Sequence, residues 1–247
     1  MRPALLVTLA ILLASCSSSA DGSAPPSAPA PTSVTTLPAP SGPPAGPPSP
    51  TLSLPAGVPR SFADDVPAAD VPAKALIPRG AGVEGTWYAA TSAGDAIVVS
   101  WSVPGPDPFR LERGVVAWRH FDDGGAPWRP VFGQAYDPHR DPVLGIAATT
   151  QDLTGDGSED ALLLASTGGS GDCAIATVVD LATGTAIYRR SACDTTFAPS
   201  TQPVGLVVTQ NVYAPGDAHC CPSSIRTTVL TFADGTWHTA SSTTSPA

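Results

Sequence analysis

Residues 174–189 have the sequence AIATVVDLATGTAIYR, which is the clearest secondary-structure pattern in the chain. Two runs rich in β-branched and aromatic residues, Ala174–Leu181 and Thr185–Arg189, flank the short segment 182–184, whose sequence is Ala-Thr-Gly. β-branched side chains favour extended backbone, and glycine readily takes the positive φ that a tight turn requires. The stretch therefore predicts an antiparallel β-hairpin.

Similar apolar runs recur on both sides of this hairpin, separated by glycine, proline and aspartate. A second turn, Ala-Asp-Gly at 233–235, joins two more runs, whereas the best helical candidate, Phe62–Leu76, is interrupted by Pro67 and Pro72. We therefore expect an all-β domain, an antiparallel meander folded as a sandwich, a small barrel or blade-like sheets. The predicted strands are Gly85–Ala90, Ala96–Ser102, Gly114–His120, Val143–Thr149, Ala161–Ser166, Ala174–Leu181, Thr185–Arg189, Val204–Val212, Ile225–Phe232 and Thr236–Ala240.

The N-terminal residues have the layout of a bacterial export signal. Arg2 precedes an apolar run, residues 3–13, which is too short to span a bilayer and is followed by small residues. The sequence LASC at 13–16 resembles a lipobox, in which the cysteine thiol takes a diacylglyceryl group before cleavage. The resemblance implies a signal peptide at 1–15, lipid on Cys16, and anchorage at the extracytoplasmic face of the cell membrane. The alternative is an ordinary secretion signal with an incidental cysteine.

The residues after the lipobox differ sharply in composition from the rest of the chain. Residues 17–59 hold 13 of the 29 prolines and one charged side chain, Asp21. Such a segment buries too little apolar surface to offset its ordering entropy, so 16–59 is predicted to be a disordered tether and 60–247 the β-rich extracytoplasmic domain. The net charge of −9 and the lack of a basic stretch argue against a nucleic-acid partner.

The segment DLTGDGSED at 152–160 is rich in oxygen ligands. Calcium takes six to eight such ligands around a sharply turned backbone. The surrounding segment, Thr150–Leu164, resembles the calcium loops of FG-GAP and VCBS-type repeats, which bind the ion between two strands of a blade. An ordinary tight turn, held by side-chain-to-backbone hydrogen bonds, is the alternative that the sequence leaves open. The resemblance implies calcium at Asp152, Thr154, Asp156, Ser158 and Asp160.

Four cysteines follow the lipobox: Cys173, Cys193, Cys220 and Cys221. Disulfides are expected outside the cytoplasm. Because Cys173 and Cys193 flank the hairpin at 174–189, we favour this pair, which leaves Cys220 with its neighbour in a strained bridge. The alternative is that both cysteines of the hairpin pair with Cys220 and Cys221. A zinc site at 219–221 lacks a fourth ligand and the usual Cys-x-x-Cys spacing.

The segment YAPGDAHCCPS at 213–223 precedes the last predicted hairpin. It resembles the Tyr…Asp-x-x-Cys-Cys-Pro-Ser turn of actinobacterial lipoproteins, including the LppP/LprE family, whose members share the lipobox and the proline-rich tether in overall layout. The resemblance implies a lipoprotein of the actinobacterial cell envelope. It concerns location and fold, since that family has no assigned biochemical activity.

Motifs that carry catalysis are weak in this sequence. The segment GGSGD at 168–172 departs from a nucleophile elbow in its last residue, and the four histidines are scattered. We therefore expect a non-enzymatic binding or structural module, with a cell-wall or envelope protein as its partner. The alternative is an envelope hydrolase or carbohydrate-processing enzyme whose site is assembled from distant residues. An acid-lined cleft would favour the enzyme, and a flat surface with an apolar patch the binding module.

Overall fold

The computed structural model describes residues 53–105, 107, 110–169, 171–218 and 220–247. Within this part of the chain the strands all pair in antiparallel fashion, and two short 3-10 turns are the other regular elements. The predicted all-β fold is therefore confirmed. Most of the predicted tether at 16–59 lies outside the described residues.

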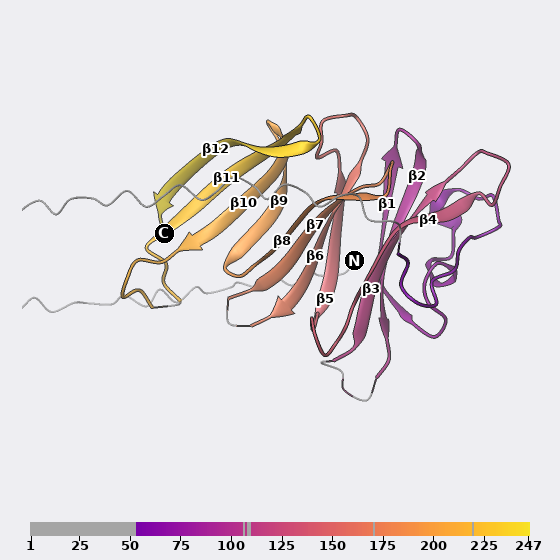
Figure 1. Cartoon of the computed structure of the whole chain (residues 1–247), viewed down its shortest axis with the longest axis horizontal. Coiled ribbons are helices and arrows are strands. Elements are labelled where there is room, and N and C mark those ends of the chain that lie inside the picture. The colour runs from indigo at the N-terminus through magenta and orange to yellow at the C-terminus, as the bar shows by residue number, and fades with distance from the viewer. Residues whose placement is uncertain (1–52, 106, 108–109, 170, 219) are drawn as a thin grey trace, which may run out of the picture. The chain divides into compact units, whose positions relative to one another are not determined.

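Twelve strands form three four-stranded meanders, so blade-like sheets are the outcome among the predicted architectures (Figure 1). The first sheet contains β1 (Gly82–Thr91), β2 (Gly94–Val103), β3 (Glu112–His120) and β4 (Trp128–Tyr136). The second contains β5 (Gly145–Gln151), β6 (Asp160–Gly168), β7 (Cys173–Asp180) and β8 (Thr185–Ala192). The third contains β9 (Thr195–Thr201), β10 (Val204–Val212), β11 (Ser224–Ala233) and β12 (Thr236–Pro246).

Both turns predicted from the sequence join neighbouring strands. The hairpin of β7 and β8 turns at Gly184, whose φ is +73°, and the hairpin of β11 and β12 turns at Asp234 and Gly235, whose φ values are +51° and +74°. A positive φ costs glycine little, and aspartate tolerates it better than most residues. Local turn chemistry therefore fixes these two hairpins.

Two strands, β4 and β9, were absent from the predicted set. Each contains a proline, Pro130 or Pro199, and proline within an apolar run argues against a central strand. Both strands lie at the edge of a sheet, where one side of the backbone needs no partner. Pro130 also sits beside a register shift, at the point where Ala117 and Trp118 of β3 pair with β4. Edge position therefore explains why the prolines are tolerated.

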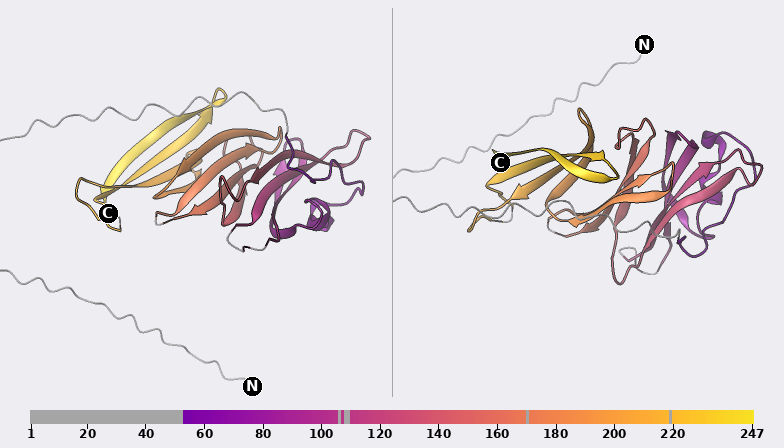
Figure 2. Two further views of the ribbon diagram at one scale, coloured as in Figure 1. Left: turned by 60° about the horizontal axis from the view of Figure 1, so that its bottom comes forward. Right: turned by 45° about the horizontal axis from the view of Figure 1, so that its top comes forward.

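The three sheets pack face to face through two apolar interfaces (Figure 2). Alanine and valine are common in the interface between the first and second sheets, whereas the interface between the second and third contains the aromatic side chains of Phe197 and Trp237. The first interface includes Ala96, Val98, Val115, Ala117, Leu163, Ala165 and Val179. The second includes Leu162, Val178, Phe197, Leu206, Val208, Leu230 and Trp237.

The segment before β1 covers the outer face of the first sheet. Its turns Ala68–Asp70 and Ala73–Ala75 each begin directly after a proline, in agreement with the prediction that no long helix forms there. The indole N–H of Trp118 donates to the carbonyl of Leu76 over 3.1 Å, so even this buried tryptophan is satisfied. Val58 packs against the same face, so the packed residues begin before the predicted boundary at position 60.

Candidate functional site

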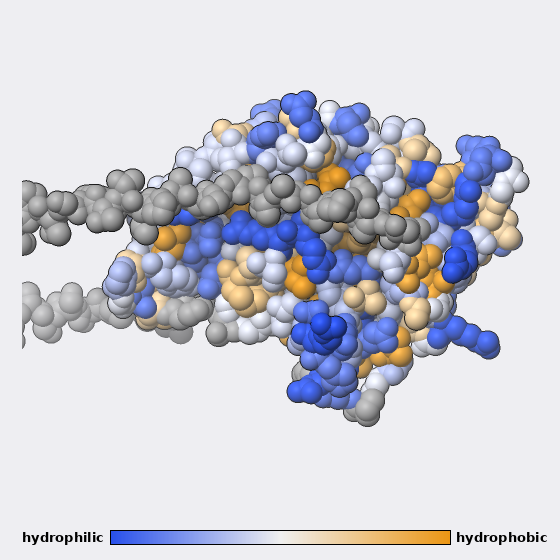
Figure 3. All heavy atoms as spheres, in the orientation of Figure 1, coloured by the Kyte–Doolittle hydropathy of each residue, from blue (hydrophilic) through white to orange (hydrophobic). Residues whose placement is uncertain are grey.

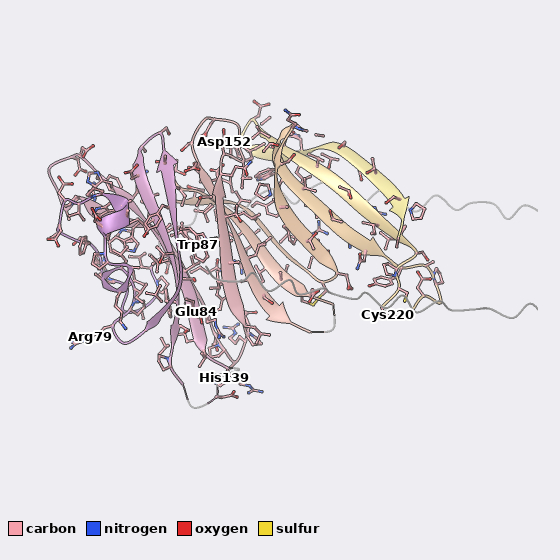
Figure 4. All side chains as sticks on the ribbon, turned by 180° about the vertical axis from the view of Figure 1, so that it is seen from behind. Arg79, Glu84, Trp87, His139, Asp152 and Cys220 are labelled. Carbon is pink, nitrogen blue, oxygen red and sulfur yellow. A yellow bond between two sulfur atoms is a disulfide. The ribbon has the colours of Figure 1, made fainter. Side chains whose placement is uncertain are left out.

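The aspartate-rich loop connects β5 to β6, and Asp152 lies at its start (Figure 4). The loop is closed by its own side chains. The carboxylate of Asp152 accepts the N–H of Gly155 over 2.6 Å through one oxygen and the N–H of Gly157 over 3.0 Å through the other. Asp156 accepts the N–H of Ser158 over 2.8 Å. Both glycines have φ of +82°, a conformation that strains other residues.

Asp160 ends the loop as the first residue of β6 and is 1% exposed. Its carboxylate accepts the N–H groups of Leu153 and Thr154 over 2.9 and 3.1 Å. Burial raises the pKa of Asp160 to about 6, and the nearby carboxylate of Asp180 adds to the rise, while the two N–H donors oppose it. The loop therefore contains one buried acid with a pKa well above its ordinary value.

The same loop fastens the second sheet to the first. The hydroxyl oxygen of Ser158 accepts the N–H of Ser92 over 3.1 Å, at the turn between β1 and β2. Glu159 pairs twice with Ala90: its N–H donates to the Ala90 carbonyl over 3.1 Å, and its carboxylate accepts the Ala90 N–H. Neither Ser92 nor Glu159 had a role in the sequence analysis, because nothing in the local sequence shows that segments nearly 70 residues apart will meet.

All five predicted calcium ligands lie in this loop, but their contacts point in different directions. Asp152 and Asp156 bind backbone donors of the loop, Asp160 faces the interior, and Ser158 contacts the first sheet. Among the described residues, no group of three or more His, Cys, Asp and Glu side chains is arranged to hold a metal ion. The observed hydrogen bonds are those of a side-chain-capped turn, and calcium binding stays a prediction.

The favoured cysteine pairing is confirmed. Cys173 and Cys193 form a disulfide that joins the first residue of β7 to the short link between β8 and β9. The next residue, Asp194, accepts the N–H of Asn211 on β10 through its backbone carbonyl over 2.9 Å. The disulfide therefore lies where the second sheet continues into the third. Cys16, the predicted lipid attachment site, lies outside the described residues.

The remaining two cysteines, Cys220 and Cys221, lie in the loop between β10 and β11 (Figure 4). Both are exposed free thiols, with their sulfur atoms 3.0 Å apart, so the expected strained bridge between them is not formed in this structure. Cross-pairing with the hairpin cysteines, the alternative that the sequence left open, is therefore not the observed arrangement. His219, the other residue of the zinc motif, lies outside the described residues.

Asp217 organises this second loop. One of its carboxylate oxygens accepts the N–H of Ala214 over 2.6 Å, the N–H of Ser223 over 3.0 Å and the Ser223 hydroxyl. The Ser223 hydroxyl and the Ala214 N–H together lower the pKa of Asp217. Cys221 adds a turn inside the ring, since its N–H donates to the carbonyl of Ala218 over 2.9 Å. The motif at 213–223 contained Asp217, but its role as the organiser was not foreseen.

An open hollow of about 300 Å³ lies beside the disulfide, between β6, β7 and β9. Asp172 is the one carboxylate among the described residues that line it. Hydrolysis of a glycosidic bond commonly uses two carboxyl groups that flank the scissile bond. The hollow does not therefore have the acid-lined character that would favour the predicted alternative, a carbohydrate-processing enzyme.

Exposed large hydrophobic side chains are distributed over separate segments. Val83 and Tyr88 lie on β1, Leu144 precedes β5, and Val204 begins β10. On the face drawn in Figure 3, hydrophobic residues occur in small groups among hydrophilic ones. Isolated apolar side chains are normal on a protein surface, so they do not identify a docking patch.

Within the described part of the chain, no helix has both the length and the apolar character needed to cross a membrane. In comparisons with known proteins, no family model, no curated protein and no solved structure matches this chain.

Proposed function

We propose that this chain is a lipoprotein of the bacterial cell envelope, anchored through a lipid on Cys16. Its β domain acts outside the cytoplasm as a non-enzymatic binding or structural module. The observation that carries the proposal is the sequence at 13–16, LASC, directly after a short apolar run preceded by Arg2. A chain bearing two or more acyl groups stays on a membrane, whereas a single chain binds only marginally.

Two further observations support an extracytoplasmic location. The Cys173–Cys193 disulfide suits an oxidising compartment, since cytosolic thiols are kept reduced. The segment at 213–223 resembles that of actinobacterial envelope lipoproteins, which favours this group of bacteria as the source. The proposed partner is a cell-wall component or another envelope protein.

The bracing of the three sheets supports a binding or structural role over catalysis. The loop at 152–160 links the first and second sheets, and the Cys173–Cys193 disulfide lies at the junction of the second and third. A domain braced in this way presents fixed surfaces to a partner at little entropic cost. A hydrolase, the alternative, would require a cleft of convergent acids, and the hollow beside the disulfide presents Asp172 alone among its described carboxylates.

Metabolic labelling tests the anchor directly. The full chain, expressed in an actinobacterial host fed with an alkyne-bearing fatty acid, should incorporate the label and fractionate with membranes. Cys16→Ser should lose both properties, whereas the matched double variant Cys220→Ser/Cys221→Ser should keep both. An unlabelled wild-type chain, or a Cys16→Ser chain that is still labelled, would overturn the proposal.

A further inference from the structure

The two thiols of the second loop are placed for reaction with each other. Cys220 and Cys221 are adjacent in sequence, both are exposed, and their sulfur atoms lie 3.0 Å apart. That separation is about 1 Å longer than a disulfide bond, and a bridge between adjacent residues is strained, which makes it more easily reduced. The Cys173–Cys193 disulfide leaves no other described cysteine as a partner for either thiol.

The loop that holds the thiols is a closed ring. Three donors, the backbone N–H groups of Ala214 and Ser223 and the Ser223 hydroxyl, meet on one oxygen of Asp217. The ring therefore brings residues 214 and 223 together and presents the thiols on the intervening segment. Holding two reacting groups close together turns a bimolecular step into an intramolecular one with a high effective concentration.

The two thiols are not equivalent. Contact with Cys220 raises the pKa of the Cys221 thiol, and the negative charge of Asp217 adds to the rise. The thiolate is the nucleophile in disulfide exchange, so a thiol with a raised pKa attacks more slowly at neutral pH. We take Cys220 as the attacking thiol and Cys221 as the resolving thiol.

We propose that Cys220 and Cys221 form a reversible dithiol–disulfide site that exchanges electrons with disulfide-bearing partners in the envelope. The partner class is a low-molecular-weight disulfide or the disulfide of a thiol oxidoreductase. The proposal rests on the extracytoplasmic location proposed above for its biological setting. Its chemistry, however, is a property of the loop and can be tested in solution.

The exchange balances in two steps. The Cys220 thiolate attacks one sulfur of the partner disulfide, the partner's sulfur–sulfur bond breaks, and one partner thiolate leaves. The Cys221 thiolate then attacks the Cys220 sulfur of the mixed disulfide, forms the Cys220–Cys221 bond and releases the second partner thiolate. The two protons lost by the cysteines end on the two partner thiols. The cysteine pair is oxidised by two electrons, and the partner disulfide is reduced by two.

The test uses the full chain with Cys16→Ser, so that Cys173, Cys193, Cys220 and Cys221 are its four cysteines. The chain, mildly reduced at the exposed pair, is treated with oxidised glutathione and weighed by mass spectrometry. We expect a loss of two hydrogen atoms with almost no glutathione retained. The single variants Cys220→Ser and Cys221→Ser lack the second thiol, so each should retain about tenfold more glutathione as a stable mixed disulfide.

The same experiment separates the alternatives. Reduction of the Cys220–Cys221 bond by reduced glutathione, before the Cys173–Cys193 bond is reduced, would support a reversible site. Exposed disulfides are the more easily reduced. Retention of glutathione by the wild-type pair, disulfide-linked dimers, or a bond from Cys220 or Cys221 to Cys173 or Cys193 would overturn the proposal. Lipid labelling at Cys16 is measured separately, so failure of the anchor and failure of the exchange site are distinguishable.

Discussion

The loops at 152–160 and 214–223 are each closed by an aspartate that accepts backbone N–H groups, but their further contacts differ. In the loop at 152–160, the buried Asp160 accepts two backbone N–H groups, and the neighbouring Glu159 binds a strand of another sheet. In the loop at 214–223, Asp217 accepts donors from its own loop, and the ring presents two exposed thiols. Both aspartates accept backbone donors of their own loop. The loop of the buried Asp160 also bonds to the first sheet through Ser158 and Glu159, whereas the loop of Asp217 presents two exposed thiols.

The largest expected effect concerns the four cysteines that the structure places in different roles. Removal of the Cys173–Cys193 disulfide by the double serine variant should lower the free energy of unfolding by about 3 kcal/mol, because a closed loop of this length restricts the unfolded chain. The matched variant Cys220→Ser/Cys221→Ser should leave the urea midpoint unchanged. Equal losses in both variants would contradict the distinction between a structural and an exposed pair.

Because Asp160 is buried, we expect the free energy of unfolding to depend on pH. The pKa of Asp160 is raised to about 6 in the folded protein, above its ordinary value near 4, so the folded state binds more protons between these values. Its contribution to stability is therefore full below about pH 4 and is lost as pH rises through 6, a change of about 2 to 3 kcal/mol.

Urea unfolding measured from pH 4 to 7 checks this expectation. Asp160→Asn cannot ionise, and its free energy of unfolding should change less over the same range. Asp152→Asn, at a half-buried position of the same loop, serves as the matched control and should keep the wild-type slope. A wild-type curve parallel to that of Asp160→Asn would show that the carboxyl group is not buried as described.

A smaller effect is expected from opening the ring in the second loop. Asp217→Ala removes the acceptor shared by Ala214 and Ser223, so the two thiols spend less time within reach of each other. Treated with oxidised glutathione, this variant should retain more glutathione than wild type, although less than Cys221→Ser. Formation of the Cys220–Cys221 bond at the wild-type rate would show that adjacency in sequence alone brings the thiols together. The ring would then have no part in the exchange.

The smallest expected effect is that of calcium on the first loop. Both carboxylate oxygens of Asp152 already accept backbone donors, so added calcium should raise the unfolding midpoint of the full chain by less than about 2 °C relative to chelator. Asp156→Ala is the control, since it removes one predicted ligand. A larger rise that is lost in Asp156→Ala would instead establish the predicted calcium site.

Features fixed by neighbouring residues could be predicted from the sequence. The hairpin at 174–189 and the turn at 233–235 follow from glycine and aspartate at positive φ, and the first hairpin brings Cys173 near Cys193. Strands β4 and β9 could not be predicted, because Pro130 and Pro199 are compatible with a strand only at a sheet edge, which is a property of the assembled fold.

Contacts between segments that are distant in sequence could not be predicted either. Glu159 and Ala90 are 69 residues apart, and their pairing depends on the packing of two sheets. The oxygen ligands of the first loop resembled a calcium site because the same residue types serve metals and capped turns. Asp217 was visible in the cysteine motif, but its three donors are recognised only once residues 214 and 223 are seen together.

Amide hydrogen exchange of the full chain tests the central contrast most directly. The amides of Leu153 and Thr154 donate to Asp160, which is 1% exposed, so they should exchange only when this buried part of the loop opens. Ala214 and Ser223 are exposed, and their amides donate to Asp217 within their own loop. They should therefore exchange through local opening, about 100-fold faster after correction for intrinsic rates. Equal protection at the two loops, or stronger protection at 214 and 223, would contradict this contrast. The contrast is between a buried loop that bonds to the first sheet and a loop that is closed only by its own hydrogen bonds.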